Sequence, residues 1–249
     1  MKIYVLFNFG SVKLNKMNLG VDGYKNGWCC CSIENNISFS THQNIQSIIE
    51  LYPNFDKIFI DIPIGLSSTN NKRLIDEKLR KHLPKGKKSS VFNAPSRTAV
   101  NCKDYNEAKT KEIKISGKSI SIQSWNISNK INEIDKFLKC NPKQVEKIHE
   151  SHPELCFYDL NNKKALEFNK KNINGFKERI DILKNYIEDV YELSEKFYFQ
   201  SKKKGIKKDD ILDATSLALS AKLWKKNGKR IITQTISKDE HNIPFGIYY

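Results

Sequence analysis

What the sequence lacks excludes several classes of protein. No stretch approaches the roughly 18 apolar residues of a membrane span, and residues 1–10 lack the longer apolar core and cleavage site of a secretory signal. Glycine-rich nucleotide loops, the Gly-x-Ser-x-Gly pattern of serine hydrolases and the His-Glu-x-x-His pattern of zinc proteases do not occur. We therefore expect a cytoplasmic protein with no membrane partner and no nucleotide cofactor.

The six cysteines show no pattern typical of zinc sites or disulfide frameworks, because no Cys-x-x-Cys pair is present. Cys29, Cys30 and Cys31 are adjacent in an apolar segment that we expect to be a strand, where neighbouring side chains face opposite ways. The sequence therefore predicts reduced thiols with a structural role.

Acidic residues are scarce relative to basic ones. Lys and Arg number 43 against 28 Asp and Glu, which gives a formal net charge of +15. Basic proteins attract polyanions, because binding to phosphates releases counterions, so nucleic acid is the first partner to expect. Nearly all of the basic residues are Lys, however, and Asn and Ile are also abundant, as codon bias in an AT-rich genome would produce. The charge therefore favours a nucleic acid partner without establishing one.

A largely apolar helix that begins with acids is predicted for residues 207–224. Asp210 and Asp213 are three residues apart, so a helix places them on one face about one turn from each other. A buried helix tolerates carboxylates only where another group offsets their desolvation, as a divalent cation would. Capping of the helix explains Asp210 equally well, whereas Asp213 lies past the first turn and is not available for capping.

The segments that precede this helix predict a mixed sheet. Residues 19–22, 28–33 and 37–41 read as strands joined by short turns, which makes an antiparallel meander. A helix over residues 44–51 and a strand over residues 57–61 follow. Because a strand after a helix suggests a crossover, we expect this strand to lie parallel to the first one.

The remaining segments complete a known topology. We expect helices over residues 71–83, 103–111, 122–140 and 174–200, and strands over residues 144–151 and 230–235. The order β-β-β-α-β-(insertion)-α-β-α is the ribonuclease H topology. The sequence thus predicts an α/β fold with a ribonuclease H-like mixed sheet flanked by helices. We expect one domain over residues 17–249, a helical insertion at about residues 65–118, and an N-terminal extension over residues 1–16.

Lone acids end two of the expected parallel strands. Asp22 follows the first strand and Asp61 ends the strand over residues 57–61, so the two meet at the same edge of the sheet. Glu154 follows a later strand, and Asp213 comes from the apolar helix. Each has a simpler interpretation, because Asp22 and Asp61 suit turns and Glu154 suits an exposed loop. Their joint arrangement nevertheless predicts a common site.

Such a site suits hard metal ions. Enzymes with this topology hold two Mg²⁺ or Mn²⁺ ions roughly 3.5–4 Å apart between carboxylates, where one ion activates water and the other stabilises the leaving oxygen of a phosphodiester. Asp and Glu oxygens suit these metals, whereas zinc would favour Cys or His. We expect Asp22, Asp61, Glu154 and Asp213 to be catalytic metal ligands, with Asp22 bridging the two ions, and Asp210 to be an additional ligand or an orienting group.

Several separated motifs occur in the order of a known family. They are Gly20-Val-Asp-Gly23 with Gly27-Trp28, Ile60-Asp-Ile-Pro-Ile-Gly-Leu66, Arg73-x-x-Asp76-x-x-x-Arg80, Ser90-Val-Phe-x-Ala-Pro-x-Arg97, Lys130-x-x-Glu133, His152-Pro-Glu154 and Asp210-x-x-Asp213-Ala214. Together they resemble the family called domain of unknown function 429, which is regarded as a group of predicted nucleases of ribonuclease H fold. The motifs cover most of residues 19–224. The resemblance implies this fold and a metal site.

Basic residues near the expected site are candidates for binding substrate. Arg73, Arg80 and Arg97 lie in the insertion, and planar guanidinium groups bind phosphates well. Lys130 is a further candidate, although an ion pair with Glu133, one turn away, is the simpler interpretation.

His152 precedes the motif proline. It is placed either to position a metal-bound water or donate to a leaving group, or to pack as a turn residue.

The leading functional hypothesis is metal-dependent phosphodiester hydrolysis, most simply by a nuclease acting on DNA or RNA. A non-catalytic nucleic-acid-binding module is the main alternative, and it predicts binding that depends on salt but not on metal. A phosphohydrolase or phosphotransferase for small molecules is a third hypothesis. The sequence does not distinguish DNA from RNA, or a monomer from a larger assembly.

Overall fold

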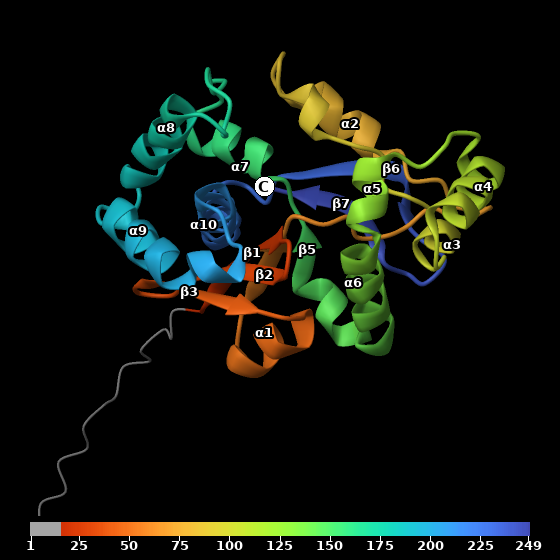
Figure 1. Ribbon diagram of the computed structural model, residues 1–249, viewed down its shortest axis with the longest axis horizontal. Coiled ribbons are helices and arrows are strands. Elements are labelled where there is room, and N and C mark those ends of the chain that lie inside the picture. The colour runs from red at the N-terminus through yellow and green to blue at the C-terminus, as the bar shows by residue number, and fades with distance from the viewer. Residues whose placement is uncertain (1–15) are drawn as a thin grey trace, which may run out of the picture.

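A five-stranded mixed sheet forms the centre of the computed structural model, which describes residues 16–249 (Figure 1). The strands are β1 (Asn18–Tyr24), β2 (Gly27–Ile33), β3 (Ile37–His42), β4 (Lys57–Ile60) and β5 (Ile148–Glu150), in the order β3-β2-β1-β4-β5. β1, β2 and β3 pair antiparallel, whereas β4 pairs parallel with both β1 and β5. This topology confirms the expected mixed sheet and is consistent with a ribonuclease H-like fold. Residues 1–15, nearly all of the expected N-terminal extension, lie outside the described residues.

Helices cover both faces of the sheet. On one face, α1 (Ile45–Leu51) and α6 (Ser128–Cys140) pack on Val21 and Cys30. On the other face, α10 (Lys208–Leu223) packs on Cys29 and Cys31, with α7 (Pro153–Leu160), α8 (Ile173–Lys184) and α9 (Val190–Ser201) around it (Figure 1). Neighbouring cysteines of β2 thus face opposite layers, as a strand requires. All six cysteines are free thiols.

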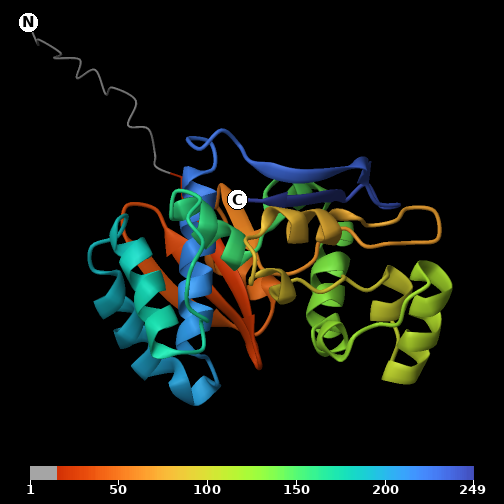
Figure 2. The ribbon, with the colours of Figure 1, turned by 90° about the horizontal axis from the view of Figure 1, so that it is seen from above.

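The chain between β4 and α6 forms a separate group of short helices. They are α2 (Ile75–His82), the 3-10 turn η1 (Lys88–Ser90), α3 (Arg97–Val100), α4 (Tyr105–Ser116) and α5 (Ile122–Asn126). Figures 1 and 2 place α3 and α4 at the end of the molecule opposite α8 and α9. This segment lies in the sequence where we expect the insertion.

The structure differs from the expected elements in three segments. The helix expected over residues 122–140 is interrupted at Ile127, which separates α5 from α6. The strand expected over residues 144–151 is shorter, because Pro142 starts the 3-10 turn η2 (Pro142–Glu146) and only β5 pairs with the sheet. Pro153 stands at the first position of α7, where proline is favoured, so a helix follows β5 directly.

The C-terminal segment forms a second, two-stranded sheet. β6 (Ile231–Lys238), longer than the strand expected over residues 230–235, pairs antiparallel with β7 (Pro244–Tyr248). The hairpin packs against α2 through Ile232, Phe245 and Ile247. Within the described residues, no helix is both long enough and apolar enough to cross a membrane.

Candidate acidic site

The carboxyl ends of β1 and β4 bring Asp22 and Asp61 together. Val21 pairs with Ile60 in the parallel register, and the backbone N–H of Asp61 donates to the carbonyl of Val21 at 3.0 Å. Asp22 is the residue after Val21, so the two acids follow a directly paired position. Asp22 is buried and Asp61 is half-buried.

Helix α10 brings Asp213 to the same edge because it lies directly on β1. A Cβ atom added to Gly20 would be 2.0 Å from the carbonyl oxygen of Ala214 and 2.2 Å from the nitrogen of Ala218. Only glycine therefore allows this approach of helix and strand. Asp213 precedes the contact, and its side chain is 2% exposed.

The three carboxylates repel one another. Burial and then the charges of Asp213 and Asp61 raise the pKa of Asp22 well above its ordinary value. Burial, with help from Asp213, raises the pKa of Asp61 to about 7. Burial also raises the pKa of Asp213. The three acids therefore lie close enough for each charge to disfavour ionisation of the others.

One ammonium group reaches this cluster, and sequence reasoning missed it. Lys170, in the connection between α7 and α8, places its Nζ 2.5 Å from Oδ2 of Asp213. Its charge lowers the pKa values of Asp22, Asp61 and Asp213, and Asp213 in turn raises the pKa of Lys170. The sequence around Lys170 holds no signal that separates it from the many other lysines.

Asp210 caps α10. The backbone N–H of Lys207 donates to its Oδ2 at 2.7 Å, which is half of a capping box. Burial raises the pKa of Asp210 to about 6. Its charge contributes to the raised pKa of Asp22 less than the charges of Asp213 and Asp61 do. This position at the edge of the cluster suits an orienting group better than a central ligand.

Glu154 faces the cluster from the first turn of α7 but pairs with an arginine. Nη2 of Arg179, a buried side chain of α8, lies 2.5 Å from Oε1 of Glu154. The second oxygen, Oε2, is buried without a hydrogen-bond partner. The charge of Glu154 raises the pKa values of Asp61 and Asp213. Glu154 thus lies beside the cluster, and its Oε2, which accepts no hydrogen bond, is 3.9 Å from the ammonium of Lys87.

Glu150 is an acid that the sequence analysis did not single out. It is a buried residue of β5, and its charge raises the pKa of Asp61. Burial raises the pKa of Glu150 itself to about 7. Its Oε1 is 2.5 Å from Arg73, and its Oε2 accepts the backbone N–H of Ile64 at 2.7 Å. The sequence did not single it out, because the strand expected over residues 144–151 also contains Glu146 and is mostly polar.

The guanidinium groups of Arg73 and Arg97 are bonded within the protein. Arg73 donates to Asp76, Glu150 and two backbone carbonyls. Arg97 pairs with Asp135, Asp239 and Glu240. Arg73 therefore links the insertion to β5, and Arg97 links it to α6 and to the turn of the C-terminal hairpin.

Arg80, Lys130 and His152 lie nearer to open space. Nη2 of Arg80 donates to Oδ1 of Asn93 at 2.6 Å in an exposed position. Lys130 donates to the carbonyl of Gly27 at 2.7 Å and stacks over Trp28, whereas Glu133 accepts from Trp28 and from the backbone of Ile45. The simple Lys130–Glu133 ion pair that we expected is therefore replaced by separate partners.

His152 is half-buried and neutral near pH 7, because desolvation lowers its pKa to about 4. Its Nδ1 is buried without a hydrogen-bond partner. His152 directly precedes α7, so it stands beside Glu154 at the wall of the site.

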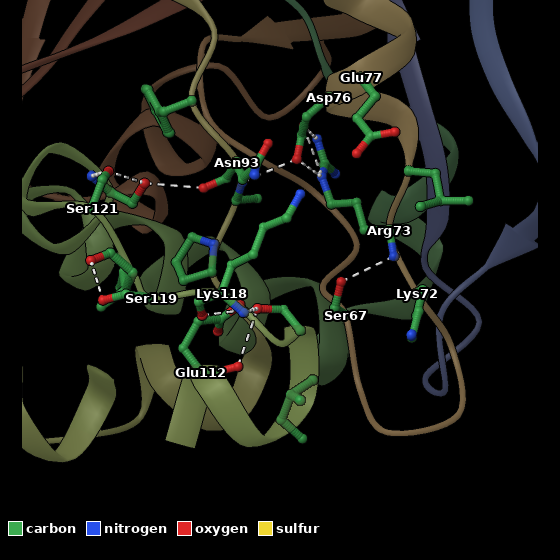
Figure 3. Close-up of a pocket in the computed structure, with 18 of the residues that line it drawn as sticks. Ser67, Lys72, Arg73, Asp76, Glu77, Asn93, Glu112, Lys118, Ser119 and Ser121 are labelled. Atoms are coloured by element: carbon green, nitrogen blue, oxygen red, sulfur yellow. Dashed lines mark hydrogen bonds and ion pairs between the residues drawn. The ribbon is translucent and has the colours of Figure 1, made fainter. Parts of the chain in front are cut away.

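Two cavities of about 380 Å³ each lie beside α2. The first is lined by Asp22, Asp61, Lys130, Glu150 and His152. The second lies between α2 and the segment that joins α4 to α5, and Figure 3 shows Lys118 extending across it toward Asn93 and Asp76. Asp76 and Phe92 line both cavities, so the two are neighbours on one surface.

The chemistry of the acids fits hard divalent cations. Asp22, Asp61, Asp213 and Glu154 offer carboxylate oxygens, and Oε2 of Glu154 accepts no hydrogen bond. The raised pKa values of Asp22, Asp61 and Asp213 are consistent with repulsion among these acids. Among residues 16–249, no three Asp, Glu, His or Cys side chains lie in an arrangement that holds a metal ion. The ammonium of Lys170 instead makes the closest contact to the cluster.

Comparison with known proteins yields one match. Residues 20–239 match a family described as "Protein of unknown function (DUF429)". No curated protein and no solved structure matches the chain.

Proposed function

The chain belongs to the DUF429 family of proteins of unknown function, and from its acidic site we propose that it is a phosphodiesterase, most simply a nuclease, that depends on Mg²⁺ or Mn²⁺. The observation that carries the proposal is the convergence of Asp22, Asp61 and Asp213 from three elements, with pKa values raised by burial and mutual repulsion. Burial of several like charges is unfavourable in free energy, and a bound cation offsets the desolvation and the repulsion.

The proposed ligands are Asp22, Asp61, Asp213 and Glu154. When bound, the metal would activate water and stabilise the charge that develops on the leaving oxygen. β1, β4 and α10 fix the carboxylates on rigid elements, which holds them in place for the reaction. Arg179 orients Glu154 by holding its Oε1, and Asp210 acts on Asp22 from the cap of α10. His152, neutral near pH 7, is placed to accept a proton at Nδ1.

The two neighbouring cavities support an extended anionic substrate. Lys130 lines the cavity beside Asp22, and Arg80 and Lys118 line the second cavity. A strand of nucleic acid that passes Phe92 would place one phosphate at the acids and a neighbouring phosphate near Lys118. The six free cysteines support a reducing compartment, for which we propose the cytoplasm.

The test is cleavage of a panel of single-stranded, double-stranded, hybrid and branched DNA and RNA with Mg²⁺, Mn²⁺ or chelator. We expect cleavage only with the metals, and a loss of roughly 10³-fold or more in Asp22→Asn, because charge stabilisation in an active site is worth several kcal/mol. Asp181→Asn, an exposed acid of α8, is the matched control and should retain activity. Full activity of Asp22→Asn would refute the proposal. Binding without cleavage would favour a non-catalytic nucleic-acid-binding module.

A second candidate is hydrolysis of a small phosphate ester. The cavity beside Asp22 has a volume of about 380 Å³, within the range of small-molecule sites. A nitrophenyl phosphodiester and free nucleotides therefore belong in the same panel. Metal-dependent turnover of these compounds, with no cleavage of any polymer, would favour this candidate.

A further inference from the structure

The positive charge that reaches the acidic cluster comes from a loop that is itself firmly held. The carboxylate of Glu178 accepts the backbone N–H groups of Glu167 and Phe168 at 2.7 and 3.1 Å. Nζ of Lys87 donates to the carbonyl of Phe168 at 2.9 Å. The backbone is therefore fixed by hydrogen bonds two residues before Lys170.

The other side of Lys170 is equally fixed. Asn172 caps α8 by accepting the N–H of Gly175 at 2.7 Å. A Cβ atom on Gly175 would be 2.0 Å from the carbonyl oxygen of Asn169, so only glycine lets the helix pack on this loop. With both flanks fixed, the position of the Lys170 ammonium is a built feature of the site.

The other acids near the cluster have cations of their own. Glu154 pairs with Arg179, while Arg73 lies between Asp76 and Glu150. Nζ of Lys170 contacts Asp213 at 2.5 Å, and within residues 16–249 neither Asp22 nor Asp61 has an ion pair of its own. Three carboxylates and one ammonium leave two negative charges, which a single divalent cation balances.

We propose that Lys170 is a resident cation of the acidic site that supplies part of the positive charge required by Asp22, Asp61 and Asp213, so that the site binds one divalent cation instead of two. This inference rests on the proposed metal-dependent function. It assigns Lys170 as a positioning residue, because the side chain holds Asp213 at 2.5 Å and thereby sets how many carboxylate oxygens remain for the metal.

The experiment is a titration of the full-length protein with Mn²⁺, followed by calorimetry and by the electron spin resonance signal of free Mn²⁺. We expect about one Mn²⁺ per chain in the wild type and about two in Lys170→Met, which keeps the length of the side chain but removes its charge. Lys171→Met, the exposed neighbour, and Lys170→Arg, which keeps the charge, should both bind about one.

Thermal unfolding gives a second measurement that does not depend on activity. In chelator, Lys170→Met should unfold at a lower temperature than the wild type, because the acids lose their internal cation, and Mn²⁺ should raise its unfolding temperature more than that of the wild type. An equal gain in both proteins would overturn the inference.

The outcomes separate this inference from the function on which it rests. Two Mn²⁺ ions in the wild type, or one in both the wild type and a folded Lys170→Met, would overturn the role of Lys170 and leave the metal site standing. No Mn²⁺ binding in any variant would overturn both. If Lys170→Met does not fold, the stoichiometry of the wild type decides, since one ion supports the inference and two refute it.

Discussion

Asp61 carries an electrostatic penalty in the folded chain. Burial first, and then neighbouring acids, raise its pKa to about 7, whereas an unfolded Asp titrates near 4. Between these values the folded state binds a proton that the unfolded state has released, so the contribution of Asp61 destabilises the fold progressively as the pH rises from about 4 to about 7. Above that range the full penalty remains.

We therefore predict that Asp61→Asn stabilises the protein in the absence of divalent metal. In chelator at pH 8, urea denaturation should give a free energy of unfolding higher than that of the wild type by roughly 2 kcal/mol, and the gain should shrink at pH 5. Asp181→Asn should show no gain at either pH. A loss of stability in Asp61→Asn at pH 8 would contradict the assigned repulsion.

Single residues also show which parts of the site the sequence reveals. Asp22 and Asp61 stood out because each ends an apolar strand, and Asp213 stood out because it lies past the first turn of an apolar helix, where a buried carboxylate is costly. Lys170 and Arg179 were not, because a basic residue among 43 carries no signal until the fold brings it to a particular acid. The partners of Arg73 and Arg97 were hidden for the same reason.

At the scale of elements, the contact of β1 with α10 determines the site. The apolar stretch over residues 207–224 and the strand over residues 19–22 were both predictable from their composition, but the distance between them depends on Gly20. The meander and the parallel crossover were predictable from turns and apolar patterning. The break at Ile127 and the hairpin of β6 and β7 were not, because they depend on packing against distant elements.

We predict that Gly20→Ala destabilises the protein by roughly 3 kcal/mol or more, because the new methyl group would overlap the backbone of α10 and force helix and strand apart. Gly23→Ala is the matched control in the same strand, since its Cβ would meet the flexible side chain of Lys130 at 3.1 Å and the ring of Trp28 at an ordinary contact distance of 3.5 Å, with no backbone atom among its nearest neighbours. Urea denaturation of both variants is the measurement. Equal, small losses would show that α10 moves away from β1 at little cost.

At the scale of the whole molecule, negative charge gathers in one buried site while the net charge is +15. Such a distribution attracts a polyanion over the surface and concentrates repulsion where a metal would sit. If the proposed nucleic acid substrate binds, surface attraction and repulsion by the buried acids would both act on it. Salt distinguishes the two, because it screens the surface attraction and screens the buried acids much less.

If the two cavities bind single-stranded nucleic acid, the affinity of the catalytically inactive Asp22→Asn variant for an oligonucleotide should fall steeply with salt. We expect a loss of roughly 10-fold or more between 50 and 200 mM, because binding releases several counterions. Adding Lys118→Gln should weaken binding further and make the salt dependence shallower, because the Lys118 side chain extends across the second cavity (Figure 3). Lys196→Gln, an exposed lysine of α9 at the opposite end of the molecule, is the control. Fluorescence anisotropy of a labelled single-stranded oligonucleotide measures all three proteins. Equal effects of the two lysine substitutions would mean that the bound strand follows net charge alone and not the cavity beside α2.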